Sequence, residues 1–232
     1  NETGIIQNIE KISDIVHSHD SLLHTDGAQA IGKLNIDVRD LQIDAMSISG
    51  HKFYGPKGIG AIYINRDIKN EVEPLIHGGG QEFKLRSGTV PTPLVVGMAE
   101  ASDFINQDLA VNNKKVDELK SRFLEILKSN VQNLTINGCQ RRRVVHNLNI
   151  RIENVDAEQL IINTPGVAFS SGSACSSGEI QSSHVLRGMG YTDLEARESF
   201  RVSFSHLQTN EEIKIAAEQI SESANKIILQ QK

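Results

Sequence analysis

The stretch SGHKFYGPKGIG, residues 49–60, holds the residue on which the interpretation of this chain depends. Its lysine, Lys52, follows an apolar run at residues 45–48 and precedes a turn at Gly55–Pro56. Small and hydrogen-bonding residues flank Lys52, which suits a lysine that is held close to a ligand. A surface lysine whose aliphatic stem covers apolar groups is the simpler alternative for Lys52 taken alone.

Two other segments carry residues of chemical interest. HTDGAQ, residues 24–29, ends a short apolar run with the carboxylate of Asp26, which by itself is equally typical of a turn. SSGSACSSG, residues 170–178, places Cys175 among five serines and two glycines. That setting favours a reactive thiol, although serine-rich segments are often plain loops. Cys139, in contrast, is a candidate for a small buried packing group.

The composition is that of an ordinary globular protein. Of 232 residues, 23% are charged and 38% apolar, and the net charge of -5 offers no basic surface for nucleic acid. The short basic run at residues 141–143 is typical of a solvated loop. No apolar stretch approaches the roughly 20 residues that span a bilayer, and the polar start does not resemble a signal peptide. Two cysteines are too few for a disulfide framework or a zinc site. We therefore expect a cytoplasmic protein, or a mitochondrial matrix protein in a eukaryote, that binds neither metal, membrane nor nucleic acid.

Hydrophobic periodicity and turn residues predict helices that alternate with short buried strands, hence an α/β fold. Thr209 followed by Glu212 predicts the start of the final helix. A change in composition at residues 107–113 predicts a boundary between domains at residues 1–109 and 110–232. We expect helices at residues 5–19, at 94–129 with a break near 112–113, from 156, and from 209 to 229. We expect strands at residues 22–25, 44–49, 59–64, 134–136, 147–152, 167–169 and 201–204.

Catalysis with pyridoxal 5'-phosphate requires an amine that forms a Schiff base, an acid beside the pyridine nitrogen, and donors for the phosphate. Lys52 suits the first role and Asp26 the second, because a carboxylate keeps the ring nitrogen protonated. Ser49 and His51 can donate to the phosphate, but each taken alone is better explained by local backbone hydrogen bonds. The combination favours a pyridoxal phosphate site, and Cys175 further along the chain suggests an enzyme that acts on sulfur.

The chain resembles the cysteine desulfurases of the NifS/IscS type, class-V aminotransferases among the fold-type I pyridoxal phosphate enzymes. The matching segments run in order from the first residue almost to the last, and the cysteine loop with the segment after it separates this group from ordinary aminotransferases. They are NETG (1–4), HTDGAQAIGK (24–33), SGHKFYGPKGIG (49–60), HGGGQ (77–81), LRSGTVP (85–91), FSSGSACSSG (169–178), SHVLRGMG (183–190) and FRVSFS (200–205).

The resemblance implies a fold of two parts. Residues 1–109 would form part of the large domain, with a mainly parallel sheet, and residues 110–232 a small α+β domain that carries the cysteine loop. The chain would then begin in the middle of the family's large domain, so that a ring-stacking histidine and a second phosphate loop lie outside it. In one departure, Phe83 and Lys84 stand where the family usually carries Arg-Gly, beside an expected dimer contact.

The resemblance also implies roles for single residues. Asn1 would lie near the cofactor's 3-hydroxyl, and Gln29 would donate to its phenolic oxygen. Thr89 would reach the phosphate bound by the other subunit of a homodimer. Arg201 would bind the substrate carboxylate through a bidentate fork. The other implied roles are those of Asp26 as pyridinium partner, Ser49 and His51 as phosphate ligands, Lys52 as Schiff-base lysine and Cys175 as the nucleophile.

The activity implied by the resemblance is the conversion of L-cysteine to L-alanine, with the sulfur left as a persulfide on Cys175. An iron–sulfur scaffold or another sulfur-acceptor protein would receive that sulfur, for cluster assembly or thiolation. Two alternatives stay open. One is a relative of the selenocysteine lyases, and the other is an inactive fragment that acts as a binding or scaffold piece.

Overall fold

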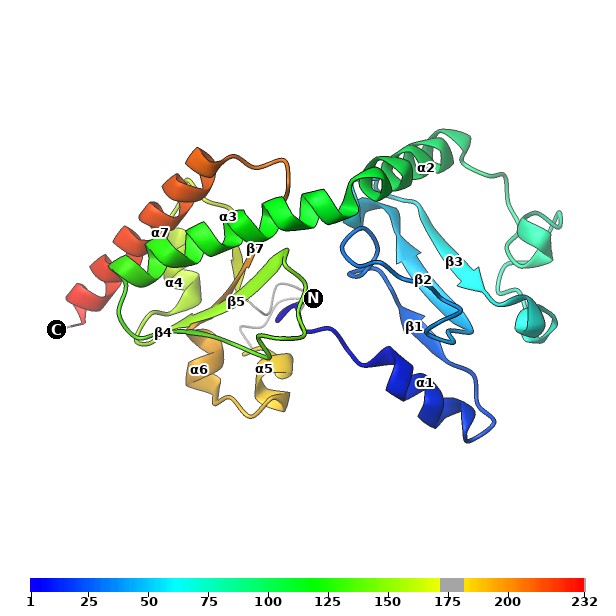
Figure 1. Cartoon of the computed structure of the whole chain (residues 1–232), viewed down its shortest axis with the longest axis horizontal. Helices are drawn as coiled ribbons and strands as arrows, with labels where there is room; N and C mark the ends of the chain where they lie inside the picture. The colour runs from blue at the N-terminus through cyan, green and yellow to red at the C-terminus, as the bar shows by residue number, and fades with distance from the viewer. Residues whose placement is uncertain (172–181, 232) are drawn as a thin grey trace. The chain divides into compact units, whose positions relative to one another are not determined.

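The structure is a computed structural model and describes residues 1–171 and 182–231 (Figure 1). The chain forms two compact units. The N-terminal unit is Gln7–Leu109, and the C-terminal unit comprises Asn1–Ile6 and the described residues from Ala110 onward. Residues 1–6, which were expected to belong to a domain at residues 1–109, thus pack with the C-terminal unit.

The N-terminal unit is built on a three-stranded sheet in the order β1-β2-β3. β1 (His24–Asp26) runs parallel to β2 (Ala45–Ser49), whereas β3 (Gly60–Ile64) returns antiparallel to β2. The parallel pair needs a long connection, and a short one suffices for the antiparallel pair. The predicted α/β fold is confirmed, and parallel pairing within this unit is confined to β1 and β2. The helices are α1 (Ile9–His17), α2 (Thr92–Gln107) and short 3-10 turns at Gly50–Lys52, Arg66–Glu71 and Glu82–Lys84.

Two small hydrophobic clusters hold the N-terminal unit together. One packs α1 against the strands, and the other packs α2 against the segment that follows β2. Their buried members are Leu23, Ile43 and Met46 in the first, and Phe53, Ala101 and Ile105 in the second. Ile31 and Ile48, which are partly buried, contact both clusters, so β2 and the segment after β1 join them.

The C-terminal unit has a four-stranded antiparallel sheet in the order β4-β5-β7-β6. This is the α+β arrangement expected for this half. The strands are β4 (Leu134–Ile136), β5 (Asn147–Ile152), β6 (Ser170–Ser171) and β7 (Ser199–Ser203). The helices are α3 (Leu109–Asn130), α4 (Ala157–Ile162), α5 (His184–Gly188), α6 (Asp193–Arg197) and α7 (Asn210–Gln230).

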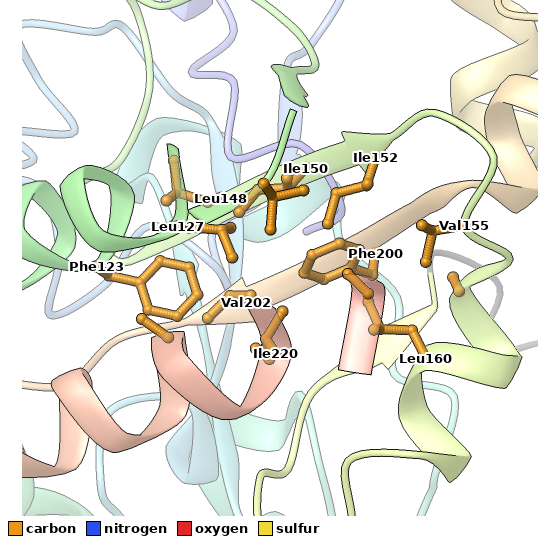
Figure 2. Close-up of a cluster of buried hydrophobic side chains, with 14 of the residues drawn as sticks. Phe123, Leu127, Leu148, Ile150, Ile152, Val155, Leu160, Phe200, Val202 and Ile220 are labelled. Carbon is orange, nitrogen blue, oxygen red and sulfur yellow. The ribbon is translucent and has the colours of Figure 1, made fainter. Parts of the chain in front are cut away.

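The two faces of this sheet differ because side chains alternate along β5. Leu148, Ile150 and Ile152 lie in the core with Phe200 and Val202 of β7, under side chains from α3, α4 and α7 (Figure 2). The ring of Phe200 also meets that of Phe169 edge to face, with the centroids 5.4 Å apart. The opposite face carries the polar side chains of β5, and these face the segment Asn1–Ile6 and helix α6.

Several element boundaries differ from the sequence prediction. The helix expected from residue 5 begins at Ile9, because the backbone of Ile5 and Ile6 is extended and pairs with residues 142–143. The long helical region breaks at Asp108 and not near residues 112–113. The short strand expected at residues 167–169 lies at Ser170–Ser171, where it pairs with β7. The predicted cap of the final helix is confirmed: Thr209 and Glu212 form a reciprocal capping box.

Candidate active site

The carboxyl ends of β1 and β2 bring the first group of predicted site residues to one edge of the sheet. Asp26 is the last residue of β1 and Ser49 the last of β2, and Asp26 lies opposite Ser47 in the ladder. Because the two strands are parallel, their carboxyl ends meet at the same edge, where ligands of open α/β sheets usually bind. The 3-10 turn that carries His51 and Lys52 follows Ser49 directly.

A tight turn holds Lys52 at this edge. The carbonyl of Gly50 accepts hydrogen bonds from the backbone N–H groups of Phe53 and Gly55, at 3.2 and 3.0 Å. A Cβ on residue 55 would lie 2.8 Å from that carbonyl oxygen, so the turn closes only around glycine. Phe53 is buried, which anchors the turn and leaves the neighbouring Lys52 side chain exposed. The lysine is thus fixed through its backbone, and its side chain is exposed.

Ser49 and His51 form a polar pair beside the lysine. Ser49 Oγ lies 3.1 Å from His51 Nδ1, within hydrogen-bond distance. The Ser49 side chain is half-buried and the His51 ring is exposed. Both are donors of the kind that a phosphate accepts, and their contact orients one toward the other.

Asp26 and Gln29 are oriented by the turn that follows β1. Asp26 is exposed, and its Oδ1 accepts a hydrogen bond of 2.8 Å from the backbone N–H of Ala28. Gln29 is half-buried, and its Oε1 accepts from Lys33 Nζ at 2.9 Å. Because the amide oxygen faces Lys33, the amide nitrogen is the end of Gln29 that is directed elsewhere as a donor.

Sequence reasoning missed a second polar pair on the same face of this sheet. His24 Nε2 lies 2.8 Å from Ser47 Oγ. His24 and Asp26 share one face of β1, as Ser47 and Ser49 share one face of β2, because side chains alternate along a strand. Counting back by two from Asp26 and Ser49 would have identified both residues.

Arg201 and Asn1 form a second group, in the C-terminal unit. Arg201 Nη1 donates to Asn1 Oδ1 at 2.8 Å. Asn147 Nδ2 donates to the backbone carbonyl of Asn1 at 2.6 Å. Asn1 was expected beside the cofactor's hydroxyl group. Its side-chain oxygen contacts the residue expected to bind the substrate carboxylate.

Thr89 and the unusual pair Phe83–Lys84 lie in the loop region before α2. Thr89 is exposed. Phe83 and Lys84 both have a left-handed backbone, with φ of +58° and +70°. A glycine adopts this conformation without strain, so the departure from Arg-Gly places a lysine side chain on a backbone that suits glycine. Lys69 Nζ lies 4.2 Å from the centre of the Phe83 ring, a cation–π contact.

Of the two cysteines, Cys139 lies within the described residues. Cys175 lies outside the described residues. Cys139 was a candidate for a buried packing group, and that prediction is wrong: its side chain is exposed in the turn before the arginine run. Hydrogen bonds from the backbone N–H groups of Arg142 and Arg141 lower the pKa of the Cys139 thiol.

One contact pattern in the N-terminal unit superficially resembles a hydrolytic triad. Ser13 Oγ lies 3.2 Å from His17 Nδ1, and His17 Nε2 lies 2.8 Å from Asp44 Oδ2. Ser13 is fully buried and donates to the carbonyl of Gln42 at 3.0 Å. Its hydroxyl is therefore inaccessible to a substrate. The hydrogen bonds of these three residues connect α1 to the residues just before β2.

Residues 1–171 and 182–231 contain neither a candidate membrane span nor a candidate metal site. No helix there has both the length and the apolar character needed to cross a membrane. No group of three or more His, Cys, Asp or Glu side chains there is arranged to hold a metal ion.

Comparison with known proteins places these residues in a family context. A family model described as Aminotransferase class-V matches residues 1–215. Cysteine desulfurase IscS of Pseudomonas putida strain F1 is 43% identical over 227 residues, which are 98% of this chain and 56% of that protein. IscS of Pseudomonas fluorescens strain SBW25 is 42% identical over 227 residues, with the same coverage. The chain thus spans about half the length of the curated relatives it matches.

Solved structures agree with the sequence comparisons. A NifS-like protein from Rickettsia africae matches with a TM-score of 0.83 at 30% identity, over 98% of this chain and 59% of its own. SspA, solved in complex with cysteine, matches with a TM-score of 0.74 at 37% identity, over 90% of this chain and 57% of its own. Both similarities extend across residues of the two units.

Proposed function

The chain belongs to the class-V aminotransferase family, and on that premise we propose that it is a pyridoxal phosphate-dependent cysteine desulfurase or a portion of one. The observation that carries the proposal is the common position of Asp26 and Lys52 at one edge of the sheet, with Ser49 and His51 between them in sequence. The similarity to proteins named cysteine desulfurase supports the same reaction.

The residues at this edge fit pyridoxal 5'-phosphate by their chemistry. The cofactor needs an amine, a carboxylate for its ring nitrogen and donors for its phosphate, and Lys52, Asp26 and the Ser49–His51 pair supply these types. Gln29 offers an amide donor for the phenolic oxygen. When bound, the cofactor supplies a protonated ring that accepts electron density from the substrate Cα.

The residues of the chain then have these proposed tasks. Lys52 binds the cofactor and afterwards carries a proton from the substrate Cα. Asp26 holds the proton on the ring nitrogen. Arg201 binds the substrate carboxylate through parallel N–H donors. The Cys175 thiolate attacks the substrate sulfur, the carbon–sulfur bond breaks, and L-alanine leaves with the sulfur retained as a persulfide on Cys175.

The partners belong to the same proposal. L-cysteine is the substrate, and an iron–sulfur scaffold or another acceptor protein takes the persulfide sulfur. We further propose a homodimer in which Thr89 reaches the phosphate site of the other subunit, and a cytoplasmic location. Exposure of Thr89 is consistent with a contact to a second chain.

Borohydride reduction of the cofactor-loaded desulfurase that contains this chain tests the cofactor site. Reduction makes the bond between lysine and cofactor permanent, and peptide mapping should then place the label on Lys52. Lys57, which lies in the same segment, is the internal control. A label on Lys57 would show that the lysine assignment is wrong.

A second experiment separates an active desulfurase from an inactive relative. Cys175→Ser should retain the cofactor and release no sulfide from L-cysteine in the presence of a reductant. Cys139→Ser, at the exposed thiol, should release sulfide at the wild-type rate. Loss of turnover in Cys139→Ser with retention in Cys175→Ser would mean that the wrong thiol is assigned to catalysis.

One observation favours the alternative of a binding or scaffold fragment. The loop region of the N-terminal unit exposes large apolar side chains, with Leu75 97% and Phe83 78% exposed. Such exposure is typical of a surface that another chain covers. Absence of bound cofactor and of sulfide release in the full desulfurase would favour this alternative.

A further inference from the structure

The segment Asn1–Ile6 lies along the polar face of the C-terminal sheet and is held there by its backbone carbonyls. Those of Asn1 and Glu2 accept from the side chains of Asn147 (2.6 Å) and Asn149 (3.4 Å) on β5. The carbonyls of Thr3 and Gly4 accept from the Arg143 side chain (2.7 Å) and the Val144 backbone N–H (2.9 Å). Four successive carbonyls are therefore bound, which fixes this segment residue by residue.

Among these four contacts, that of Asn147 holds Asn1 itself. The Asn147 side chain is 9% exposed, and its register places it opposite Ser203, while Asn149 lies opposite Arg201. The backbone of Gly4 passes so close that a Cβ there would lie 3.3 Å from Asn147 Cβ. The donor nitrogen of Asn147 and the carbonyl of Asn1 are thus held together by close packing as well as by their hydrogen bond.

The burial of Asn147 points to a role for its donor. Its Oδ1 is buried and has no hydrogen-bond partner in the part of the chain that the structure describes. A buried acceptor without a partner is unfavourable, so an apolar side chain would serve better if packing were all that this position required. The neighbouring Asn149 is different, because its Oδ1 accepts from Asn137 at 2.7 Å.

Asn1 connects Asn147 to Arg201 through two hydrogen bonds. Asn1, whose carbonyl is held by Asn147, accepts from Arg201 Nη1 through its side-chain oxygen. We propose that Asn147 is a positioning residue for carboxylate recognition: it fixes Asn1, and Asn1 in turn orients the Arg201 guanidinium toward a substrate α-carboxylate. This inference rests on the proposed function, which assigns carboxylate binding to Arg201.

The test compares two amines that differ only by a carboxylate, L-alanine and ethylamine. Their affinities are measured from the absorbance of the cofactor in the loaded desulfurase that contains this chain. In Asn147→Asp, which keeps the size and removes the donor, the dissociation constant of L-alanine should rise about tenfold, the effect of one lost hydrogen bond. That of ethylamine should not change. If Asn147→Asp does not fold, Asn147→Ser, which shortens the donor and buries no charge, carries the same expectation.

Two further variants make the result specific. Asn225→Asp is the matched control, because Asn225 Nδ2 also donates to a backbone carbonyl, that of Asn130 at 2.9 Å, and should leave both affinities unchanged. Arg201→Lys should weaken L-alanine binding by itself, and adding Asn147→Asp should then have little further effect, as expected for residues that act through one another.

The outcomes distinguish the two proposals. If the wild-type protein binds L-alanine no better than ethylamine, the role of Arg201 in the proposed function fails, and this inference fails with it. If the wild-type preference is present and is lost in Arg201→Lys, yet is retained in Asn147→Asp or its substitute Asn147→Ser, the inference about Asn147 alone is overturned.

Discussion

The two units differ in how they are stabilised. The C-terminal unit buries one continuous hydrophobic core between its sheet and helices α3, α4 and α7, whereas the N-terminal unit divides its core into two clusters of three buried residues. Among the largest side chains that the structure describes as fully buried, Ile105 alone comes from the N-terminal unit. The proposed cofactor residues therefore lie on the less well packed unit, and the proposed substrate arginine lies on the better packed one.

The N-terminal unit, with its small core, belongs to a chain that spans 56% of the length of its curated relatives. A unit with a small core gains little hydrophobic stabilisation, which scales with buried apolar area. We therefore expect the N-terminal unit to be the less stable of the two when the chain is studied by itself.

Hydrogen exchange should show the difference most directly. We expect backbone amides in β5 and β7 to exchange at least about a thousandfold more slowly than those in β1 and β2, equivalent to about 4 kcal/mol of opening free energy. Mass spectrometry of the chain, with rates corrected for intrinsic exchange, measures this ratio. Equal protection of the two sheets would show that the two units do not differ in stability.

Removing a large core side chain should destabilise the C-terminal unit strongly. Phe200→Ala leaves a cavity beside Phe169 and should lower the free energy of unfolding by about 3–5 kcal/mol, as measured by urea denaturation. Ile62→Ala is the control in the N-terminal unit, where Ile62 is 57% exposed on β3, and should change it by less than about 0.5 kcal/mol. Similar losses for both variants would contradict the assignment of the main core.

The same substitution should have opposite effects in the two units. Lys84→Gly relieves a left-handed backbone in the N-terminal unit and should raise the free energy of unfolding by up to about 1 kcal/mol. Lys128→Gly, within helix α3 of the C-terminal unit, should lower it by about 1 kcal/mol. Thermal unfolding of both variants measures the two shifts. A loss of stability in Lys84→Gly would show that its backbone is not strained.

The smallest effect concerns acid stability of the N-terminal unit. Burial by itself raises the pKa of Asp44, but hydrogen bonds from His17 and the backbone N–H of Leu23 outweigh it and lower the pKa below its usual value of about 3.9. A lowered carboxyl pKa stabilises the fold above the unfolded pKa, and this contribution is lost as the pH falls through the folded pKa.

Below about pH 4 the wild-type chain should therefore lose stability more steeply than Asp44→Asn. Denaturation of both proteins between about pH 6 and 2 compares the slopes. Asp40→Asn, at an exposed carboxylate with no hydrogen bond from His17, is the control and should follow the wild type. Identical slopes for the wild type and Asp44→Asn would show that the His17–Asp44 contact does not contribute.

Much of the fold was predictable because it depends on local pattern. The apolar run at residues 59–64, after the turn at Gly55–Pro56, predicted β3, and Thr209 with Glu212 predicted the start of α7. The start of α1 was not predictable in this way. Ile5 and Ile6 continue its helical period, yet they pair with residues 142–143, and no local signal reveals a partner so distant in sequence.

The candidate site also contains residues that were recognisable from the sequence and contacts that were not. Asp26, Ser49 and Lys52 were recognisable because each ends or follows a short apolar run, and strand ends meet at one edge. The contact of Asn1 with Arg201, and the support from Asn147, depend on the register of β5 and β7 and were invisible in the sequence. Exposure of Cys139 was missed because a cysteine type alone does not reveal whether its turn is covered.

The attachment of residues 1–6 to the C-terminal sheet has a consequence for biosynthesis. The chain leaves this sheet at residue 6, builds the whole N-terminal unit, and returns at residue 110. Arg201 is 200 positions after Asn1, so a ribosome that adds about 5–20 residues per second needs roughly 10–40 s to make both partners. During that interval the segment 1–6 has no completed sheet on which to pack. Residues 1–6 are therefore translated well before the β5 and β7 residues that finally hold them.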